Sequence, residues 1–175
     1  MHREIPFRSR HERTIVNTCC TRRTANDNPG IIAPPPLLYL ASLAAGFAFS
    51  TFAPIVSFPQ AFRVFGLIFL LLSGFLARWA FLSMKNIGTS ANPRKPSGAL
   101  AKNGPFSFSR NPIYVAMTGL YLGISLLGNA VWPLIFLPFL LMLMHHGVIL
   151  REEAYLAKQF GEAYLEYKSK TPRWL

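Results

Sequence analysis

Charge is scarce in this sequence, and acidic charge is the scarcest. Charged residues make up 14% of the 175 residues, with 7 Asp and Glu against 18 Lys and Arg. So little charge is unusual for a soluble domain of this size. The net charge of +11 would suit a nucleic acid, but the basic residues flank apolar blocks and form no stripe. We therefore expect anionic membrane lipids, and no nucleic acid, as partners.

Cysteine is also rare, and its placement predicts neither a disulfide nor a metal site. Cys19 and Cys20 are adjacent in a polar stretch, which makes a poor structural disulfide and leaves no second pair for a metal. His145 and His146 are neighbours in an apolar block, where adjacent residues of a helix point to different faces. We therefore expect no bound metal.

Hydrophobic residues, 51% of the chain, gather instead in four blocks. The blocks have no polar faces, unlike the helices of a soluble protein, and their lengths suit helices in a bilayer. Pro34 to Pro36 open the first block, and Pro133 and Pro138 break the last one near its start. We predict an all-α integral membrane protein with four transmembrane helices arranged as two hairpins. The spans are residues 37–56, 61–84, 113–127 and 131–150.

The polar segments complete this domain organisation. Residues 1–30 carry six Arg and too few apolar residues for a core, so they predict a disordered basic tail before a membrane domain at 31–175. Residues 151–169 predict a helix that continues from the fourth span. In that helix Phe160, Tyr164 and Tyr167 share one face. We expect this face to pack against the membrane surface or the central loop, which joins the second and third spans. Gly161 should permit a close approach without ending the helix.

Lys and Arg also predict the orientation. They precede the first block, lie between the second and third, and follow the fourth, while the turns near 57–60 and 128–130 carry none. Basic residues favour the cytoplasmic side of a membrane. Both termini, the central loop and the C-terminal helix should therefore be cytoplasmic, in a protein that we expect in a bacterial inner membrane.

Residues 100–114 form the most polar segment between apolar blocks. Gly104-Pro105 and Asn111-Pro112 interrupt any regular element there, and the segment also carries aromatic, Arg and Asn side chains. Further along stand Arg-Glu-Glu-Ala-Tyr-Leu at 151–156, Phe-Gly-Glu-Ala-Tyr-Leu-Glu-Tyr at 160–167 and a closing Pro-Arg-Trp-Leu. A polar loop at the mouth of a helix bundle is a natural place to grip a ligand.

This ordered set of motifs resembles the isoprenylcysteine carboxyl methyltransferase family over about residues 31–175. The family consists of membrane enzymes that use S-adenosylmethionine and is related to the phospholipid N-methyltransferases. The resemblance implies cofactor contacts along the central loop, at the following helix and at the acidic pair. The residues implied are Gly98, Ala99, Leu100, Ala101, Phe106, Asn111, Pro112, Ile113, Tyr114 and Glu152.

Residue chemistry supports the same cofactor. Glu152 and Glu153 follow a membrane helix, whose C-terminal end disfavours negative charge, so a cation should compensate them. The ammonium of S-adenosylmethionine can take a charge-assisted hydrogen bond from a carboxylate, and its sulfonium can lie near Phe106 or Tyr114. Arg110 can bind the carboxylate of the cofactor. Alternatively, Arg110 or Arg151 simply pairs with the glutamates.

The acceptor is less well defined by the sequence. Asn111 stands where eukaryotic prenylcysteine enzymes usually have His, and Phe106 where they often have Tyr. Their substrate-positioning Arg corresponds to Val148 here, which leaves Arg151 as the nearest candidate for the substrate. No catalytic base is identifiable.

We predict a methyltransferase acting on a lipophilic or membrane-borne carboxylate, thiol or amine. The alternatives are a phospholipid or small-thiol methyltransferase and, in another class, a non-enzymatic membrane protein or transporter. A transporter would be expected to carry polar groups at mid-membrane.

Overall fold

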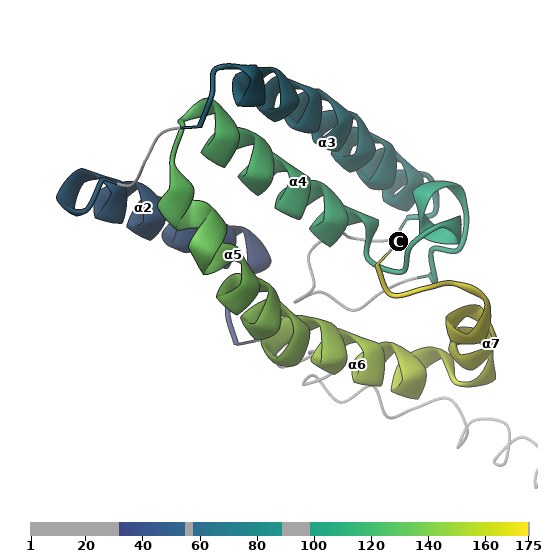
Figure 1. The fold of residues 1–175 in the computed structure, drawn as a ribbon. Helices are drawn as coiled ribbons and strands as arrows, with labels where there is room; N and C mark the ends of the chain where they lie inside the picture. The colour runs from purple at the N-terminus through teal and green to yellow at the C-terminus, as the bar shows by residue number, and fades with distance from the viewer. Residues whose placement is uncertain (1–31, 55–57, 89–98, 175) are drawn as a thin grey trace, which may run out of the picture.

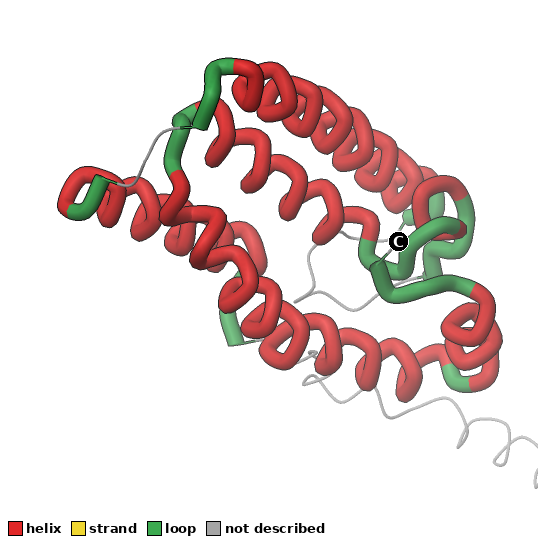
Figure 2. The backbone as a smooth tube through the Cα atoms, in the orientation of Figure 1, coloured by secondary structure: helices red, strands yellow, loops and turns green. Residues whose placement is uncertain are grey.

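The computed structural model describes residues 32–54, 58–88 and 99–174 (Figure 1). Every regular element in these ranges is helical (Figure 2). The elements are α2 (Pro35–Phe52), α3 (Ala61–Asn86), the 3₁₀ turn η1 (Gly104–Ser107), α4 (Pro112–Leu127), α5 (Val131–Met144), the π-helical turn η2 (His145–Ile149), α6 (Leu150–Phe160) and α7 (Glu162–Lys170). The predicted tail at 1–30, the cysteine pair and Gly98 lie outside the described residues.

Three helices are long and apolar enough to cross a membrane: Pro35–Phe52, Ala61–Asn86 and the continuous stretch Val131–Phe160. Helix α4 is apolar as well, but it has only 16 residues. At 1.5 Å per residue it extends about 24 Å, short of the roughly 30 Å of a hydrocarbon core. The all-helical class is confirmed, and three spans meet the length criterion.

Helices α3 and α4 form one closely packed pair (Figure 1). Their backbones meet at Gly66 of α3 and Gly123 of α4. A Cβ atom added to Gly66 would lie 3.0 Å from the Gly123 carbonyl oxygen, and one added to Gly123 would lie 2.9 Å from the Gly66 oxygen. One turn earlier in α4, Gly119 faces Ser73 of α3. Small residues spaced four apart allow such close approach of membrane helices.

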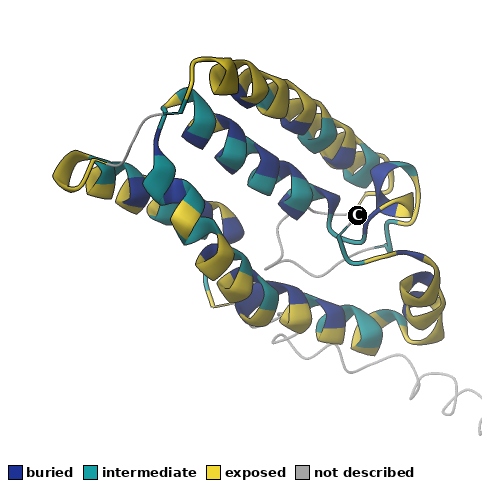
Figure 3. Cartoon of the chain, in the orientation of Figure 1, coloured by how far each residue is buried: buried dark blue, intermediate teal, exposed yellow. Residues whose placement is uncertain are grey.

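Helices α2 and α5 form the second pair, and hydroxyl groups join it to α4. Tyr39 of α2 hydrogen-bonds Thr118 at 2.8 Å, and Ser42 of α2 hydrogen-bonds Tyr121 at 3.0 Å. The Tyr121 hydroxyl also lies 2.9 Å from the carbonyl oxygen of Pro133 in α5. These bonds satisfy polar groups within the bundle, which an apolar surrounding would otherwise penalise. The outer face of α3, in contrast, exposes its large apolar side chains (Figure 3).

The last long helix differs from expectation at two points. Pro133 and Pro138 do not break α5, which runs unbroken from Val131 to Met144; the irregular turn comes later, at η2. The helix then continues through α6, so Glu152 and Glu153 do not stand at a C-terminal helix end. The helix macrodipole therefore gives no reason for a cation to compensate these glutamates.

Gly161 also corrects a prediction. It has φ 52° and ends α6, and nothing apart from its chain neighbours comes within 4 Å of a Cβ built on it. Positive φ suits glycine at a helix end, because glycine has no Cβ to clash. The predicted helix over 151–169 is therefore two helices, and α7 turns back toward η1 and the start of α4 (Figure 1).

Candidate functional site

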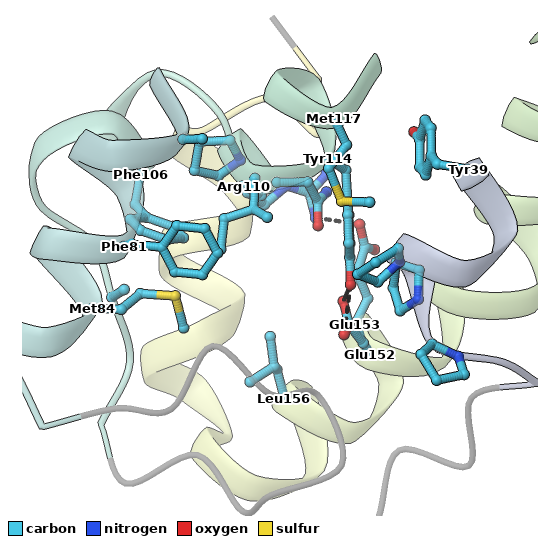
Figure 4. A pocket seen from close by; sticks show the side chains of 18 of the residues that line it. Tyr39, Phe81, Met84, Phe106, Arg110, Tyr114, Met117, Glu152, Glu153 and Leu156 are labelled. Atoms are coloured by element: carbon cyan, nitrogen blue, oxygen red, sulfur yellow. Dashed lines mark hydrogen bonds and ion pairs between the residues drawn. The ribbon is translucent and has the colours of Figure 1, made fainter. Parts of the chain in front are cut away.

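A cavity of about 760 Å³ lies where the bundle of α2 to α5 meets α6 and α7. Its walls come from the first half of α2, the last turns of α3, residues 99–101, η1, the length of α4, α6 and α7. Figure 4 shows the side chains that converge on it. Pockets of 300–1,000 Å³ with mostly apolar walls and a few convergent polar groups are typical binding sites for small molecules.

Glu152 and Tyr114 form the first polar feature of the cavity. The Tyr114 hydroxyl lies 2.8 Å from Oε1 and 2.9 Å from Oε2 of Glu152, so one hydroxyl is shared between both carboxylate oxygens (Figure 4). A carboxylate can accept about four hydrogen bonds. Glu152 thus retains acceptor capacity on the side of the cavity, where a cationic donor would satisfy it.

Glu153, one residue further, has a different environment. It is 6% exposed and accepts hydrogen bonds from Arg173 Nε at 2.7 Å and Arg173 Nη2 at 3.0 Å. Arg110 Nη1 lies 3.0 Å from Glu153 Oε1, and Lys168 Nζ lies 3.3 Å from Oε2. One buried carboxylate therefore gathers three cations. The hydrogen bonds to Glu153 raise the pKa of Arg173.

Arg110 is the least satisfied of these cations. Its side chain is 10% exposed and lines the cavity. Despite the ion pair with Glu153, neither its Nε nor its Nη1 makes a hydrogen bond of good geometry within the described residues. A guanidinium offers five donors, and leaving donors unsatisfied in a buried site is costly.

Residues Thr171–Trp174, which we call the strap, hold the entrance to α4 in place. The Arg110 amide donates to the Pro172 carbonyl at 2.9 Å, and the Asn111 side-chain amide donates to the Arg173 carbonyl at 3.0 Å. Ser109 Oγ lies 3.3 Å from the same Arg173 oxygen. The strap thus ties the central loop to the end of α7, and Trp174 packs against a buried cluster that includes Tyr39, Tyr114 and Met144.

The aromatic face predicted over residues 160–167 packs against the central loop. This is one of the two positions expected for it. Tyr164 is 1% exposed, and the Tyr167 hydroxyl donates to the Phe106 carbonyl at 2.6 Å. Burial, reinforced by the nearby Tyr164, raises the pKa of Tyr167 to about 12. Tyr167 therefore keeps its proton at ordinary pH and fixes η1, including Phe106, against α7.

The remaining walls of the cavity are apolar. Leu40 and Leu43 of α2 line it together with Phe81 and Met84 of α3. Met117, Leu120 and Ile124 of α4 continue the same wall. The cavity thus has a polar region around Glu152 and Arg110 and an apolar region between the helices (Figure 4).

A family model described as phospholipid methyltransferase matches residues 61–163. The chain belongs to this family. The match covers more than half of the sequence and runs from α3 through α6, which includes the central loop and both glutamates. No curated protein and no solved structure matches the chain.

The phospholipid methyltransferase family is a broader group than the isoprenylcysteine carboxyl methyltransferases that the sequence motifs resemble. It supports a membrane methyltransferase and does not distinguish the isoprenylcysteine enzymes within the wider group. Helix α2, most of α7 and the strap lie outside the matched residues, although all three contribute to the cavity or hold it together.

The structure gathers nearly all of the predicted site residues around this cavity. Lining it are Ala99, Leu100, Ala101, Phe106, Arg110, Asn111, Pro112, Ile113, Tyr114, Glu152 and Glu153. Gly98 lies outside the described residues, and Arg151 does not line the cavity. Whether these residues bind the cofactor stays a prediction.

Sequence reasoning missed several residues of the site. Tyr39 and Tyr164 line the cavity, and Arg173 reaches Glu153 from 20 residues away. Tyr39 is a lone tyrosine in an apolar block, which marks nothing by itself. Arg173 entered only as one of the basic residues after the fourth block and as part of the closing Pro-Arg-Trp-Leu. The Gly119–Gly123 spacing was also missed, although small residues four apart are a recognisable helix-packing signal in a sequence.

Proposed function

We propose that this protein is an S-adenosylmethionine-dependent methyltransferase that acts on a lipophilic, membrane-borne acceptor. The observation that carries the proposal is the cavity itself, which joins a carboxylate and a buried guanidinium at one end to apolar helix walls at the other. A cofactor with both an ammonium and a carboxylate suits the polar end. A lipid suits the apolar end. Membership of the phospholipid methyltransferase family supports both halves.

The polar end suits the amino-acid part of the cofactor. Glu152 has spare acceptor capacity beside Tyr114, so it can bind an ammonium through a charge-assisted hydrogen bond. Arg110 lines the same cavity with an unsatisfied Nε, so it can bind a carboxylate. Glu153 already has three cationic partners, which makes it a weaker candidate for cofactor contact than Glu152.

Phe106 and Tyr114 both line the cavity, and Tyr114 is bonded to Glu152 at its polar end. Both side chains are 8% exposed, so they present aromatic surface in a largely dry environment. A sulfonium, like other cations, is attracted to an aromatic face. S-adenosylmethionine supplies an electrophilic methyl group on that sulfonium. The rings would shield the methyl group from water, which is the chief competing nucleophile.

The apolar end suits the chain of a lipid acceptor. Helix α2 packs chiefly on α5 and α3 chiefly on α4, yet both contribute to the cavity. Leu40 of α2 and Phe81 of α3 both line the cavity and are largely exposed, and Figure 4 shows Phe81 and Tyr39 of α2 on opposite sides of it. An acceptor could therefore enter sideways from the bilayer, while the cofactor enters from water at the polar end.

The reaction asks mainly for alignment. Methyl transfer is an in-line displacement, so holding the nucleophile against the methyl group supplies much of the rate. A carboxylate or thiolate acceptor needs no base, whereas an amine must lose a proton first. The family match favours a phospholipid amine, and an isoprenylcysteine carboxylate or a small thiol are the other candidates.

We also propose that α4 completes a four-span topology, with both termini and the central loop in the cytoplasm. The support is the distribution of Lys and Arg together with the tight packing of α4 along the 26-residue α3. A reporter fused after Leu175 should report the cytoplasm, and one inserted at Asn129 should report the opposite side. The same signal from both fusions would refute the four-span arrangement.

Binding of radiolabelled S-adenosylmethionine to the purified, detergent-solubilised protein tests the activity. Saturable binding, followed by transfer of label to an added acceptor, is the expected result. Phosphatidylethanolamine, a prenylcysteine and a small thiol should be offered in parallel, since the labelled product identifies the acceptor class. Absence of binding by folded, inserted protein would favour a non-enzymatic membrane protein instead.

A further inference from the structure

The charges around Glu153 do not balance. Arg110, Arg173 and Lys168 all approach this single carboxylate within 3.3 Å. The sequence has no Asp or Glu between Asp27 and Glu152, so the described residues offer few other carboxylates to these cations. Of the other three described carboxylates, Glu152 is bonded to Tyr114 and Glu166 to Lys170.

The three cations do not share Glu153 equally. Arg173 uses two nitrogens and reaches both oxygens, at 2.7 and 3.0 Å, in the bidentate geometry that makes the strongest arginine–carboxylate pairs. Lys168 is 43% exposed and sits at 3.3 Å, so solvent screens its contribution. Arg110 makes a single approach without a well-aligned hydrogen bond. Arg173 is therefore the principal partner of Glu153.

Arg110 is left buried, charged and short of acceptors. Its side chain is nine-tenths buried and faces the cavity, and its Nε has no partner within the described residues. Burying guanidinium donors without acceptors is unfavourable, so the unsatisfied Nε and Nη1 suit a ligand that brings an anionic group. If Arg173 were absent, Glu153 would lose its bidentate partner and could turn the Oε1 now held by Arg173 fully to Arg110.

Hydrogen bonds between the strap and the start of α4 keep Arg173 paired with Glu153 beside Arg110. The Pro172 carbonyl accepts from the Arg110 backbone amide, and the next residue along the strap carries the guanidinium that holds Glu153. The Arg173 carbonyl in turn accepts from Asn111, the neighbour of Arg110. These bonds hold Arg110 and Arg173 beside one carboxylate, where both approach Oε1 of Glu153.

We infer that Arg173 is a positioning residue that occupies Glu153 and thereby keeps the guanidinium of Arg110 available to an anionic oxygen group in the cavity. That group is the carboxylate of the cofactor or the phosphate of a lipid acceptor, and the proposal rests on the function proposed above. Arg173 acts through Glu153 and Arg110 and does not itself line the cavity.

The test compares Arg173→Gln, Arg173→Lys and the double variant Glu153→Gln/Arg173→Gln in the full-length protein. Lys170→Gln is the matched control, because Lys170 is on the same stretch and pairs with Glu166 on the exposed surface. Each protein is titrated with labelled S-adenosylmethionine and with its decarboxylated analogue, which lacks the carboxylate. KM for phosphatidylethanolamine is measured alongside.

If the anion is the cofactor carboxylate, Arg173→Gln should weaken binding of S-adenosylmethionine about ten-fold, the loss of one charge-assisted contact, and leave the decarboxylated analogue unaffected. Arg173→Lys should fall between, because lysine keeps the charge without the fork. The double variant should recover most of the affinity, since no carboxylate then competes for Arg110. If the anion is the lipid phosphate, Arg173→Gln should instead raise KM for phosphatidylethanolamine. Arg173→Lys should raise it less, and the double variant should bring it back toward the parent value.

A purely structural strap predicts something else. Both ligands would then lose affinity equally, and the double variant would be no better than the single one; either result overturns the proposal. So would an Arg173→Gln protein that matches the parent in both assays. If that variant does not fold, Arg173→Lys and the double variant still decide by the same pattern. A parent that binds neither compound refutes the proposed function itself, and the role of Arg173 falls with it.

Discussion

The four-helix bundle and the polar cap above it are held together in opposite ways. In the bundle of α2 to α5, the helices approach closely at glycines and other small residues, as where Gly66 meets Gly123. In the cap, formed by η1, α6, α7 and the strap, contacts depend on charged and polar groups, as around Glu153. Large apolar side chains are exposed on the bundle, such as Phe75 at 68%, whereas the cap buries Tyr164.

The difference follows from the two solvents. Lipid offers no hydrophobic gain for bringing apolar helices together, so close backbone packing and internal hydrogen bonds must do so. Water competes with every ion pair at a surface, so the cap network is effective only because Glu153 and Arg110 are buried. The cavity lies at the junction, which is why it can offer charges at one end and an apolar wall at the other.

Breaking the bundle contact should have the largest effect. Gly66→Leu would push a side chain into the backbone of α4 at Gly123, because even a Cβ would lie 3.0 Å from its carbonyl oxygen. Overpacking of this kind costs about 1–3 kcal/mol or more. We expect a clear loss of monodisperse protein after heating in detergent. Gly74→Leu is the matched control in the same helix, where an added Cβ would meet nothing within 4 Å beyond its chain neighbours and the backbone of its own helix. Equal behaviour of the two variants would show that close packing does not hold the pair.

A smaller but specific effect should come from the polar end of the cavity. Glu152→Gln keeps the shape and removes the charge, so cofactor affinity should fall by roughly ten- to a hundred-fold, the equivalent of about 1.5–3 kcal/mol. Titration with labelled S-adenosylmethionine measures it. Glu166→Gln, in the exposed part of α7, is the control. Unchanged affinity would remove Glu152 from the cofactor site, and aggregation of the variant would indicate a structural role.

The next largest effect should come from breaking the hydrogen bond that fixes η1 to α7. Tyr167→Phe removes the donor that bonds the Phe106 carbonyl and should destabilise the cap by about 1 kcal/mol. Hydrogen exchange at residues 104–107 should accelerate, while exchange in α3 and α4 stays as in the parent. Uniform acceleration across the bundle would contradict the separation between the two regions.

The same tyrosine predicts a dependence on alkaline pH. Its folded pKa of about 12 lies above the ordinary value of 10.0, so the folded state retains a proton that the unfolded chain releases. The stabilising contribution is complete below pH 10 and is lost as pH rises toward 12. The parent should therefore lose more stability across this interval than Tyr167→Phe does, as measured by thermal unfolding at a series of pH values. Parallel curves would show that Tyr167 does not titrate differently in the folded state.

The exposed pair in α7 should matter least. Lys170 Nζ lies 2.6 Å from Glu166, and this bond lowers the pKa of Glu166, but both side chains are largely in solvent. Exposed ion pairs of this type contribute little to stability. We expect Lys170→Ala to unfold at the same temperature as the parent and to bind the cofactor equally well. A measurable loss would show that the polar network extends beyond the buried core of the cap.

Much of the helical framework was predictable because it depends on local composition. The block at 61–84 became α3 at Ala61–Asn86, and the turn near 128–130 became a turn with Asn129 at φ 51°. The end of α6 at Gly161 was missed. Glycine tolerates both an ordinary helix and a positive φ, and nothing in the neighbouring residues distinguishes the two. The π-helical turn at His145–Ile149 likewise has no sequence signature.

What the sequence alone determined is the class of the protein: apolar blocks that must be helical in a bilayer, and motifs whose order resembles membrane methyltransferases. What only the tertiary structure decided is the division of roles between neighbours. Glu152 and Glu153 are identical in sequence terms, yet one receives a tyrosine hydroxyl and the other an arginine from the strap. Successive residues of a helix point about 100° apart, so their partners depend on which distant segments pack on each side.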